Sequence, residues 1–197
     1  MAQGAAYTFN PEFVDGMTVR DVAGYMLHGT ITGSAAIDAG GKYGQGLLCT
    51  GGAMRVSNID EFLYPVNTDG GVSVAVWVQL SDNTAAARCI MSTTSGGSLN
   101  WALYASNASG NVEVKISGVT YSTSTSILDG AFHHVMLVLD TVAASHTVTL
   151  YVDGVSVLSV PATAVLDYSG NVTMELGRNA LSEIGRASCR ERVSKQV

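Results

Sequence analysis

Two adjacent histidines, His133 and His134, stand in the segment AFHHVMLVLD (residues 131–140) and raise the question of a metal site or a catalytic pair. Side chains alternate between the two faces of a strand, so His133 shares a face with Val135, whereas His134 points the other way. Two side chains on opposite faces cannot readily bind one metal ion. We therefore expect one histidine to be hydrogen-bonded at the edge of the fold and the other to be half-exposed.

Carboxylates, which glycoside hydrolysis needs in pairs, are few. Before residue 183 the only glutamates are Glu12, Glu61, Glu113 and Glu175. Glu113 and Glu175 are single acids in alternating segments and are expected to face solvent. The sequence also contains no GxSxG nucleophile elbow and no phosphate-binding loop. These observations predict that the protein is not an enzyme.

Aromatic side chains are the candidates for a binding surface, because their rings combine a large apolar area with defined geometry. Trp101, Tyr104 and Tyr121 are the residues that we expect to contact a ligand. Trp101 and Tyr104 fall on opposite faces of one predicted strand, so at most one of them can share a platform with Tyr121. Core packing is the alternative for each of the three, and it is the preferred interpretation for Trp77.

Asp21 and Asp69 lie in glycine-containing segments, where their carboxylates could provide oxygen ligands for Ca²⁺. The alternative is that both are turn formers, a common role of aspartate in such loops. No other cofactor is predicted.

Strands must position these residues, because apolar and polar residues alternate along most of the chain. The segment VSVAVWVQL (residues 72–80) places four valines and Leu80 on one face. Asp153 and Gly154 interrupt a similar pattern and predict a tight β-hairpin, since both central turn residues need positive φ. No long helical periodicity is present. Many short strands separated by turns predict an all-β sandwich.

The composition predicts one compact domain, with 47% hydrophobic and 13% charged residues in a chain of 197. The formal net charge of −6 argues against nucleic acid as a partner. No apolar run is long enough to insert into a membrane, and the first residues lack the features of a secretory signal. Cys49 and Cys89 are expected to be buried free thiols, with a disulfide as the alternative.

The last fifteen residues, 183–197, differ from the rest because they are rich in arginine. Residues 183–193, EIGRASCRERV, resemble a translated sequencing adapter. We therefore interpret residues 1–182 as the domain and residues 183–197 as a non-native tail, and we expect the natural reading frame to continue differently after Ser182.

Several motifs together resemble the laminin-G-like, concanavalin A-like family. An aromatic residue, a histidine and an apolar strand at residues 132–140 are followed by the hairpin motif LYVDG at 150–154. A tryptophan-bearing strand lies at 72–80, and GGKYGQGLLCTGG at 40–52 resembles a further family segment. The resemblance covers about residues 5–179 and implies a two-sheet antiparallel jelly-roll sandwich. The family's closing strand has no counterpart here, so we expect the sandwich to lack its last strand.

The resemblance implies a non-catalytic recognition module that binds carbohydrate or a protein surface. The adapter-like tail indicates a gene recovered from environmental DNA, which favours an extracellular or virion-associated role in a phage or bacterial structural protein. One alternative is an accessory domain of a larger secreted glycoside hydrolase, and another is a purely structural virion protein. The sequence leaves the ligand and the oligomeric state open.

Overall fold

The computed structural model describes most of the chain with the exception of its ends and several loops. The described residues are 9–21, 27–57, 59, 71–80, 87–106, 109–140, 146–162, 166 and 171–177, with side chains from Asp15 onward except that of Asp21. Asp69 and residues 183–197 lie outside the described residues.

The described part of the chain consists of strands and turns, without a helix. In chain order the strands are β1 (Phe9–Asp15), β2 (Thr18–Asp21), β3 (Gly29–Thr32), β4 (Ala35–Gly41), β5 (Gly44–Cys49), β6 (Ala53–Ser57), β7 (Gly71–Gln79), β8 (Arg88–Ser95), β9 (Ser98–Ala105), β10 (Asn111–Ile116), β11 (Val119–Ser126), β12 (Phe132–Asp140), β13 (Thr147–Val152), β14 (Val155–Pro161) and β15 (Val172–Leu176).

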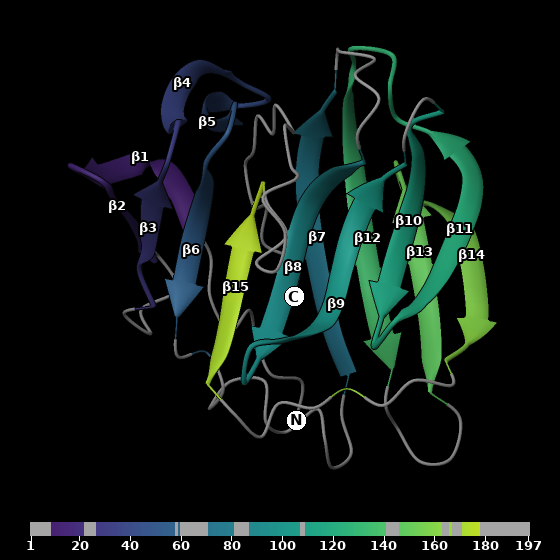
Figure 1. The fold of residues 1–197 in the computed structure, drawn as a ribbon. Coiled ribbons are helices and arrows are strands. Elements are labelled where there is room, and N and C mark those ends of the chain that lie inside the picture. The colour runs from purple at the N-terminus through teal and green to yellow at the C-terminus, as the bar shows by residue number, and fades with distance from the viewer. Residues whose placement is uncertain are drawn as a thin grey trace, which may run out of the picture.

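Two antiparallel sheets form the layers of the sandwich. The larger sheet has the strand order β1-β2-β3-β6-β15-β8-β9-β10-β11, and the smaller one has the order β14-β13-β12-β7. Strands β8 to β10 lie in front of β7, β12 and β13 in the view of Figure 1, while the separate β4–β5 hairpin lies at one end of the molecule. This arrangement confirms the predicted all-β antiparallel jelly-roll sandwich.

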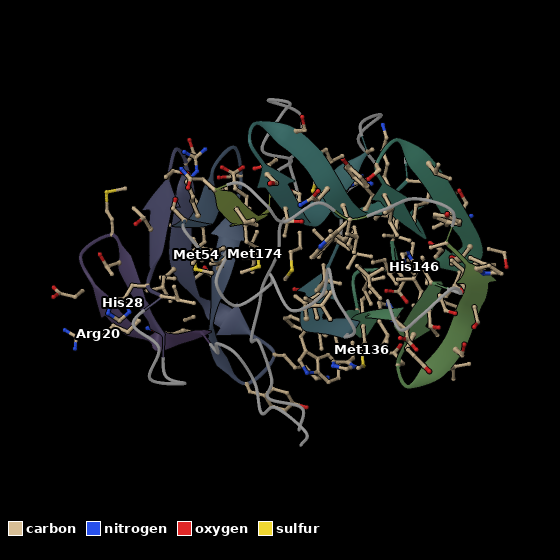
Figure 2. All side chains as sticks on the ribbon, turned by 90° about the horizontal axis from the view of Figure 1, so that it is seen from below. Arg20, His28, Met54, Met136, His146 and Met174 are labelled. Atoms are coloured by element: carbon tan, nitrogen blue, oxygen red, sulfur yellow. The ribbon has the colours of Figure 1, made fainter. Side chains whose placement is uncertain are left out.

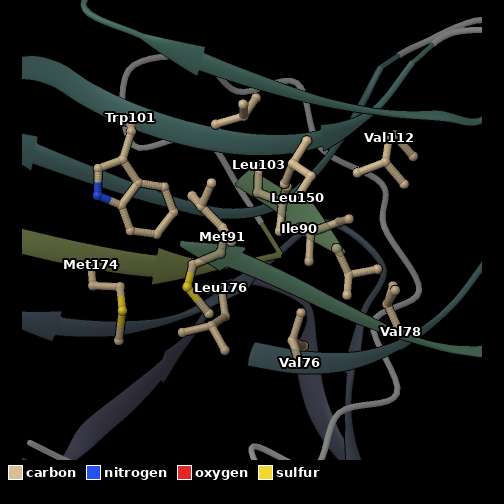
Figure 3. Close-up of a cluster of buried hydrophobic side chains, with 14 of the residues drawn as sticks. Val76, Val78, Ile90, Met91, Trp101, Leu103, Val112, Leu150, Met174 and Leu176 are labelled. Atoms are coloured by element: carbon tan, nitrogen blue, oxygen red, sulfur yellow. The ribbon is translucent and has the colours of Figure 1, made fainter. Parts of the chain in front are cut away.

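The core lies between the two sheets and follows the predicted alternation (Figure 3). In β7, Val76 and Val78 are almost completely buried, and Val135 and Leu137 of β12 are fully buried beside them. Strands β8 and β9 supply the opposite wall. Burying alternate residues of each strand is the main apolar contribution to stability in such a sandwich.

The β13–β14 hairpin turns at Asp153 and Gly154, as predicted. Both residues have positive φ, +51° and +81° respectively, which is the conformation that matches the right-handed twist of the flanking strands. Aspartate is one of the few residues that tolerate this conformation. The carboxylate of Asp153 also accepts a hydrogen bond from the N–H of His134 on β12 at 2.8 Å. The turn thereby ties the hairpin to the start of β12.

Cys49 and Cys89 are buried free thiols, as expected from their apolar surroundings. Burial raises the pKa of Cys89 well above its ordinary value, because the thiolate would be desolvated. Cys89 therefore lacks the environment of a reactive nucleophile.

Candidate ligand-binding surface

The structure does not bring together the three aromatic residues predicted to bind a ligand. Trp101 is only 1% exposed and packs in the core between the sheets (Figure 3), so its assignment to a ligand platform is wrong and the core alternative applies. Tyr121 is on the same inward face, because Val114 lies opposite both Leu103 and Tyr121 in the sheet. Its half-buried ring packs against the core cluster.

Tyr104 lies on the other face of the larger sheet, opposite Glu113 of β10. It is half-buried there and shares no surface with Trp101 or Tyr121. Of the two predicted calcium ligands, Asp21 ends β2, with its side chain not described, and Asp69 is not described at all. The calcium prediction therefore stays a prediction.

The two histidines point to opposite faces of β12, as the alternation predicts. The Nδ1 atom of His133 lies 2.8 Å from Oδ2 of Asp153, and its Nε2 atom lies 3.0 Å from Oδ1 of Asp129. Carboxylates only accept hydrogen bonds, so both contacts are satisfied when the imidazole is protonated and donates twice. Both ring nitrogens are thus engaged, which leaves neither available to take a proton from a substrate.

His133 and its two carboxylate partners, Asp129 and Asp153, shift one another's pKa values. Partial burial acts to lower the pKa of His133, but the hydrogen bonds to Asp153 and Asp129 outweigh it and the net shift is upward. The pKa of Asp129 is lowered, first by the backbone N–H of Ala131 and then by His133. Burial acts to raise the pKa of Asp153, but the N–H of His134 and the His133 side chain bring it below its ordinary value. This cluster binds the β13–β14 turn to the start of β12.

The outer face of the smaller sheet carries a group of aromatic side chains that the sequence interpretation did not assign to a site. We call it the aromatic patch and define it by Lys42, Tyr43, Trp77, Phe132 and His134. Two structural units build this patch. Trp77 of β7 lies directly opposite His134 of β12, and Phe132 precedes His134 by two residues on the same face. Lys42 and Tyr43 form the turn of the β4–β5 hairpin.

Trp77 is the centre of the aromatic patch. Its ring centroid lies 5.2 Å from that of His134 at an interplanar angle of 53°, and 5.8 Å from that of Tyr43 at 85°. Edge-to-face and tilted contacts of this kind are the favoured geometries of aromatic pairs. Trp77 and His134 are half-buried, and Tyr43 is 50% exposed. The patch is therefore held by its own contacts and still presents ring surface to solvent.

The Lys42 ammonium lies above the rings of the patch. Its Nζ atom is 4.9 Å from the ring centroid of Trp77, 5.8 Å from that of Phe132 and 6.0 Å from that of Tyr43. Cations at this distance are attracted to the electron-rich ring faces. The side chain of Lys42 remains exposed.

The outer surface continues from the patch across the smaller sheet. Met136, two residues after His134, lies opposite Ala75 of β7 and Tyr151 of β13, and it is half-buried. In Figure 2, Met136 lies at the side of the smaller sheet that faces away from β8 and β9. Met136 thus extends the outward surface of the smaller sheet beyond the patch.

The alternation of β7 contained the signal for Trp77. If Val76 and Val78 face the core, then Trp77 between them must face outward, so its assignment to the core is wrong. The sequence contains no comparable signal for Lys42 and Tyr43. Their place in the patch depends on where the β4–β5 hairpin packs against the smaller sheet.

The glutamates differ from expectation at one position. Glu175 of β15 is completely buried rather than solvent-facing, and its Oε1 accepts a hydrogen bond from Nε of Arg55 at 2.7 Å. Pairing of this kind is what makes a buried carboxylate tolerable. Glu113 is half-buried and accepts a hydrogen bond from the Ser122 hydroxyl at 3.0 Å. The two acids therefore take part in structural contacts.

Within the described ranges, no group of three or more His, Cys, Asp or Glu side chains is placed to hold a metal ion. The same residues contain no helix that is long and apolar enough to cross a membrane.

A family model described as the concanavalin A-like lectin/glucanases superfamily matches residues 51–187, which is more than half of the chain. The chain belongs to this superfamily. The match includes Trp77, Phe132 and His134 of the aromatic patch, and it confirms the family resemblance of the motifs at residues 72–80, 132–140 and 150–154. A comparison with curated protein sequences found no match.

Solved structures from different proteins share the fold of this superfamily member. Domain 4 of AbnA, an extracellular GH43 arabinanase from Geobacillus stearothermophilus solved with arabinotriose, has a TM-score of 0.67 and 18% identity, and the similarity covers 100% of this chain and 95% of that one. The receptor-binding domain of botulinum neurotoxin mosaic serotype C/D has a TM-score of 0.60 and 15% identity, with 97% of this chain and 47% of that one covered.

A sialidase from Trypanosoma rangeli, solved in complex with sialic acid, has a TM-score of 0.65 and 13% identity, with 95% of this chain and 29% of the sialidase covered. The chain thus spans nearly all of the arabinanase domain, about half of the neurotoxin domain and less than a third of the sialidase. At these identities the similarities show the fold.

Proposed function

We propose that this chain is a non-catalytic carbohydrate-binding module of an extracellular protein and that the aromatic patch is its binding surface. The observation that carries the proposal is the patch itself, in which Tyr43, Trp77 and Phe132 meet around a solvent-exposed lysine. The C–H groups on one side of a sugar ring carry partial positive charge and pack well on the electron-rich face of an aromatic ring. A surface of half-exposed rings is therefore suited to a saccharide.

The neighbouring structures support this proposal. One of them is a complete domain of an extracellular arabinanase solved with a trisaccharide, and this chain covers 95% of that domain. That similarity favours an accessory domain of a secreted glycoside hydrolase as the setting of the module. The second candidate setting, a phage or bacterial surface protein, rests on the interpretation of the tail and stays a prediction.

A glycan array probed with the wild-type chain and two variants tests the proposed surface. Trp77→Ala is expected to weaken binding by about 10-fold or more, the loss typical of a central aromatic residue in a binding site. Tyr104→Ala removes a half-buried aromatic from the other sheet and serves as the matched control, and we expect it to bind like wild type. Loss in Tyr104→Ala with retention in Trp77→Ala would place the site on the larger sheet instead. Absence of binding to any saccharide would favour a purely structural role.

The same array with EDTA tests the calcium prediction at Asp21 and Asp69. The aromatic patch consists of rings and an ammonium group and has no carboxylate ligand for Ca²⁺, so we expect binding to persist when Ca²⁺ is removed. If EDTA abolishes binding and added Ca²⁺ restores it, a calcium site is part of the binding surface, and Asp21→Asn and Asp69→Asn identify its ligands.

A further inference from the structure

The positive charge of Lys42 is held in place but is not neutralised by its contacts. Trp77, Phe132 and Tyr43 surround the ammonium at 4.9, 5.8 and 6.0 Å from their ring centroids. The ring faces attract a cation but carry no formal charge. Within the described residues, Lys42 contacts aromatic rings and no carboxylate.

Three described carboxylates of the segments that carry or adjoin the patch have partners other than Lys42. Asp153 and Asp129 bond to the two ring nitrogens of His133. Asp38 of the β4–β5 hairpin accepts a hydrogen bond from the N–H of Gly40 at 2.7 Å. None of these three carboxylates pairs with Lys42, and the exposed Lys42 ammonium keeps donor capacity for a group in solution.

We infer that the aromatic patch selects acidic sugars, with the ring of the sugar packed on the aromatic side chains and its carboxylate bonded to Lys42. The inference rests on the proposed function and names its ligand class. Uronic acids and sialic acids combine the two features that the site requires, namely a face of C–H groups and a carboxylate at the edge of the same ring. A neutral sugar would satisfy the rings and leave the ammonium without an anionic partner.

The rings also orient the lysine, which makes it more selective than an ordinary surface cation. A free lysine side chain loses rotamer entropy when it forms an ion pair, and this cost reduces the gain. Lys42 is already restricted by its contacts with three rings, so less entropy is lost when a carboxylate binds. We therefore treat Lys42 as a specificity-determining residue of the patch.

The test uses oligosaccharides in matched acidic and neutral pairs, with the full chain as the binding protein. The probes are trigalacturonate with its methyl ester, and sialyllactose with lactose. Wild type is expected to prefer the acidic member of at least one pair by about 10-fold, the size of a charge-assisted hydrogen bond. Lys42→Gln should remove this preference while the neutral member is still bound, and Lys42→Arg should keep it. Lys115→Gln, on the larger sheet, is the control and should behave as wild type.

The outcomes separate the inference from the proposed function. Equal binding of acidic and neutral members, with both lost in Trp77→Ala, would overturn the inference and leave the proposed function standing. A preference for acidic sugars that survives in Lys42→Gln would also overturn it. If wild type binds no member of either pair and no other saccharide on the array, both the inference and the proposed function are wrong.

Discussion

The two tryptophans of the chain occupy opposite kinds of environment, although both belong to strands that alternate in the same way. Trp101 is buried between the sheets, whereas Trp77 faces outward among the residues of the aromatic patch. Whether a tryptophan faces the core or the outer surface therefore depends on which face of its strand carries the buried apolar residues.

Intrinsic fluorescence should distinguish the two tryptophans. In Trp101→Phe the remaining emission comes from Trp77 and is expected to change when a saccharide binds, since the ligand covers that ring. In Trp77→Phe the emission comes from Trp101, which should report unfolding and remain constant during a ligand titration. A ligand-dependent signal from Trp101 alone would contradict the assignment of the patch as the binding surface.

His133 makes the free energy of unfolding depend on pH. Its pKa is raised on folding, so its contribution is fully present below the unfolded value of about 6.5 and is lost as the pH rises through the folded value. The pKa values of Asp129 and Asp153 are lowered on folding, so their contribution is present above about pH 4 and is lost as the pH falls through the folded values. The cluster stabilises most between these limits.

Chemical denaturation of wild type and His133→Gln across this range measures the effect. We expect wild type to be more stable than His133→Gln by about 1 kcal/mol near pH 5. The gain is small because the side chains of Asp129 and Asp153 are 60% and 48% exposed, so solvent screens their charges. The difference should shrink toward pH 9. His146→Gln is the control, and a difference for His133→Gln that does not change with pH would contradict the assigned role of the cluster.

Gly154 and Gly177, each next to the end of a strand, have similar backbone conformations but different surroundings. Gly154 in the β13–β14 turn has φ +81° with open space at the position of a Cβ atom, and Gly177 after β15 has φ +85° with the side chain of Cys49 in that position. Both favour glycine because positive φ strains other residues. Only at Gly177 would a side chain also overlap a neighbouring residue, namely Cys49.

Gly154→Ala and Gly177→Ala separate these two causes. We expect Gly154→Ala to lower the free energy of unfolding by about 1 kcal/mol through backbone strain. Gly177→Ala should lower it by about 2–4 kcal/mol, since the added methyl group overlaps Cys49 in a packed core. Denaturant titration of both variants gives the comparison. Equal losses would show that Cys49 moves aside without cost.

Sequence patterns predicted the strands more successfully than the site. The alternation in β7 and β12 and the turn at Asp153 and Gly154 are local signals, because they depend on neighbouring residues along the chain. The aromatic patch joins the β4–β5 turn to Trp77 and His134, which are distant in sequence. Its composition follows from the docking of one hairpin on another sheet, and a single sequence contains no local pattern for such a contact.

The described residues form one core that both sheets share, which predicts cooperative unfolding. The interpretation of residues 183–197 as a non-native tail predicts that removing them leaves the fold unchanged. A chain that ends at Ser182 should have the same Tm and the same affinity for saccharides as the full chain. Differential scanning calorimetry of the two chains tests it, and a lower Tm for the shorter chain would show that the tail contributes to the fold.

The placement of the aromatic patch on the outward side of β7 and β12 has a consequence for how the superfamily can diversify. Trp77, Phe132 and His134 alternate with Val76, Val78 and Val135, so the outward-facing set and the core-facing set are interleaved along the same strands. We expect substitutions in the outward set to leave the inward packing unchanged, because the two sets point to opposite faces. A lineage can therefore change the chemistry of this outer surface by point mutation while the core of the sandwich is retained, because outward and inward residues alternate along each strand.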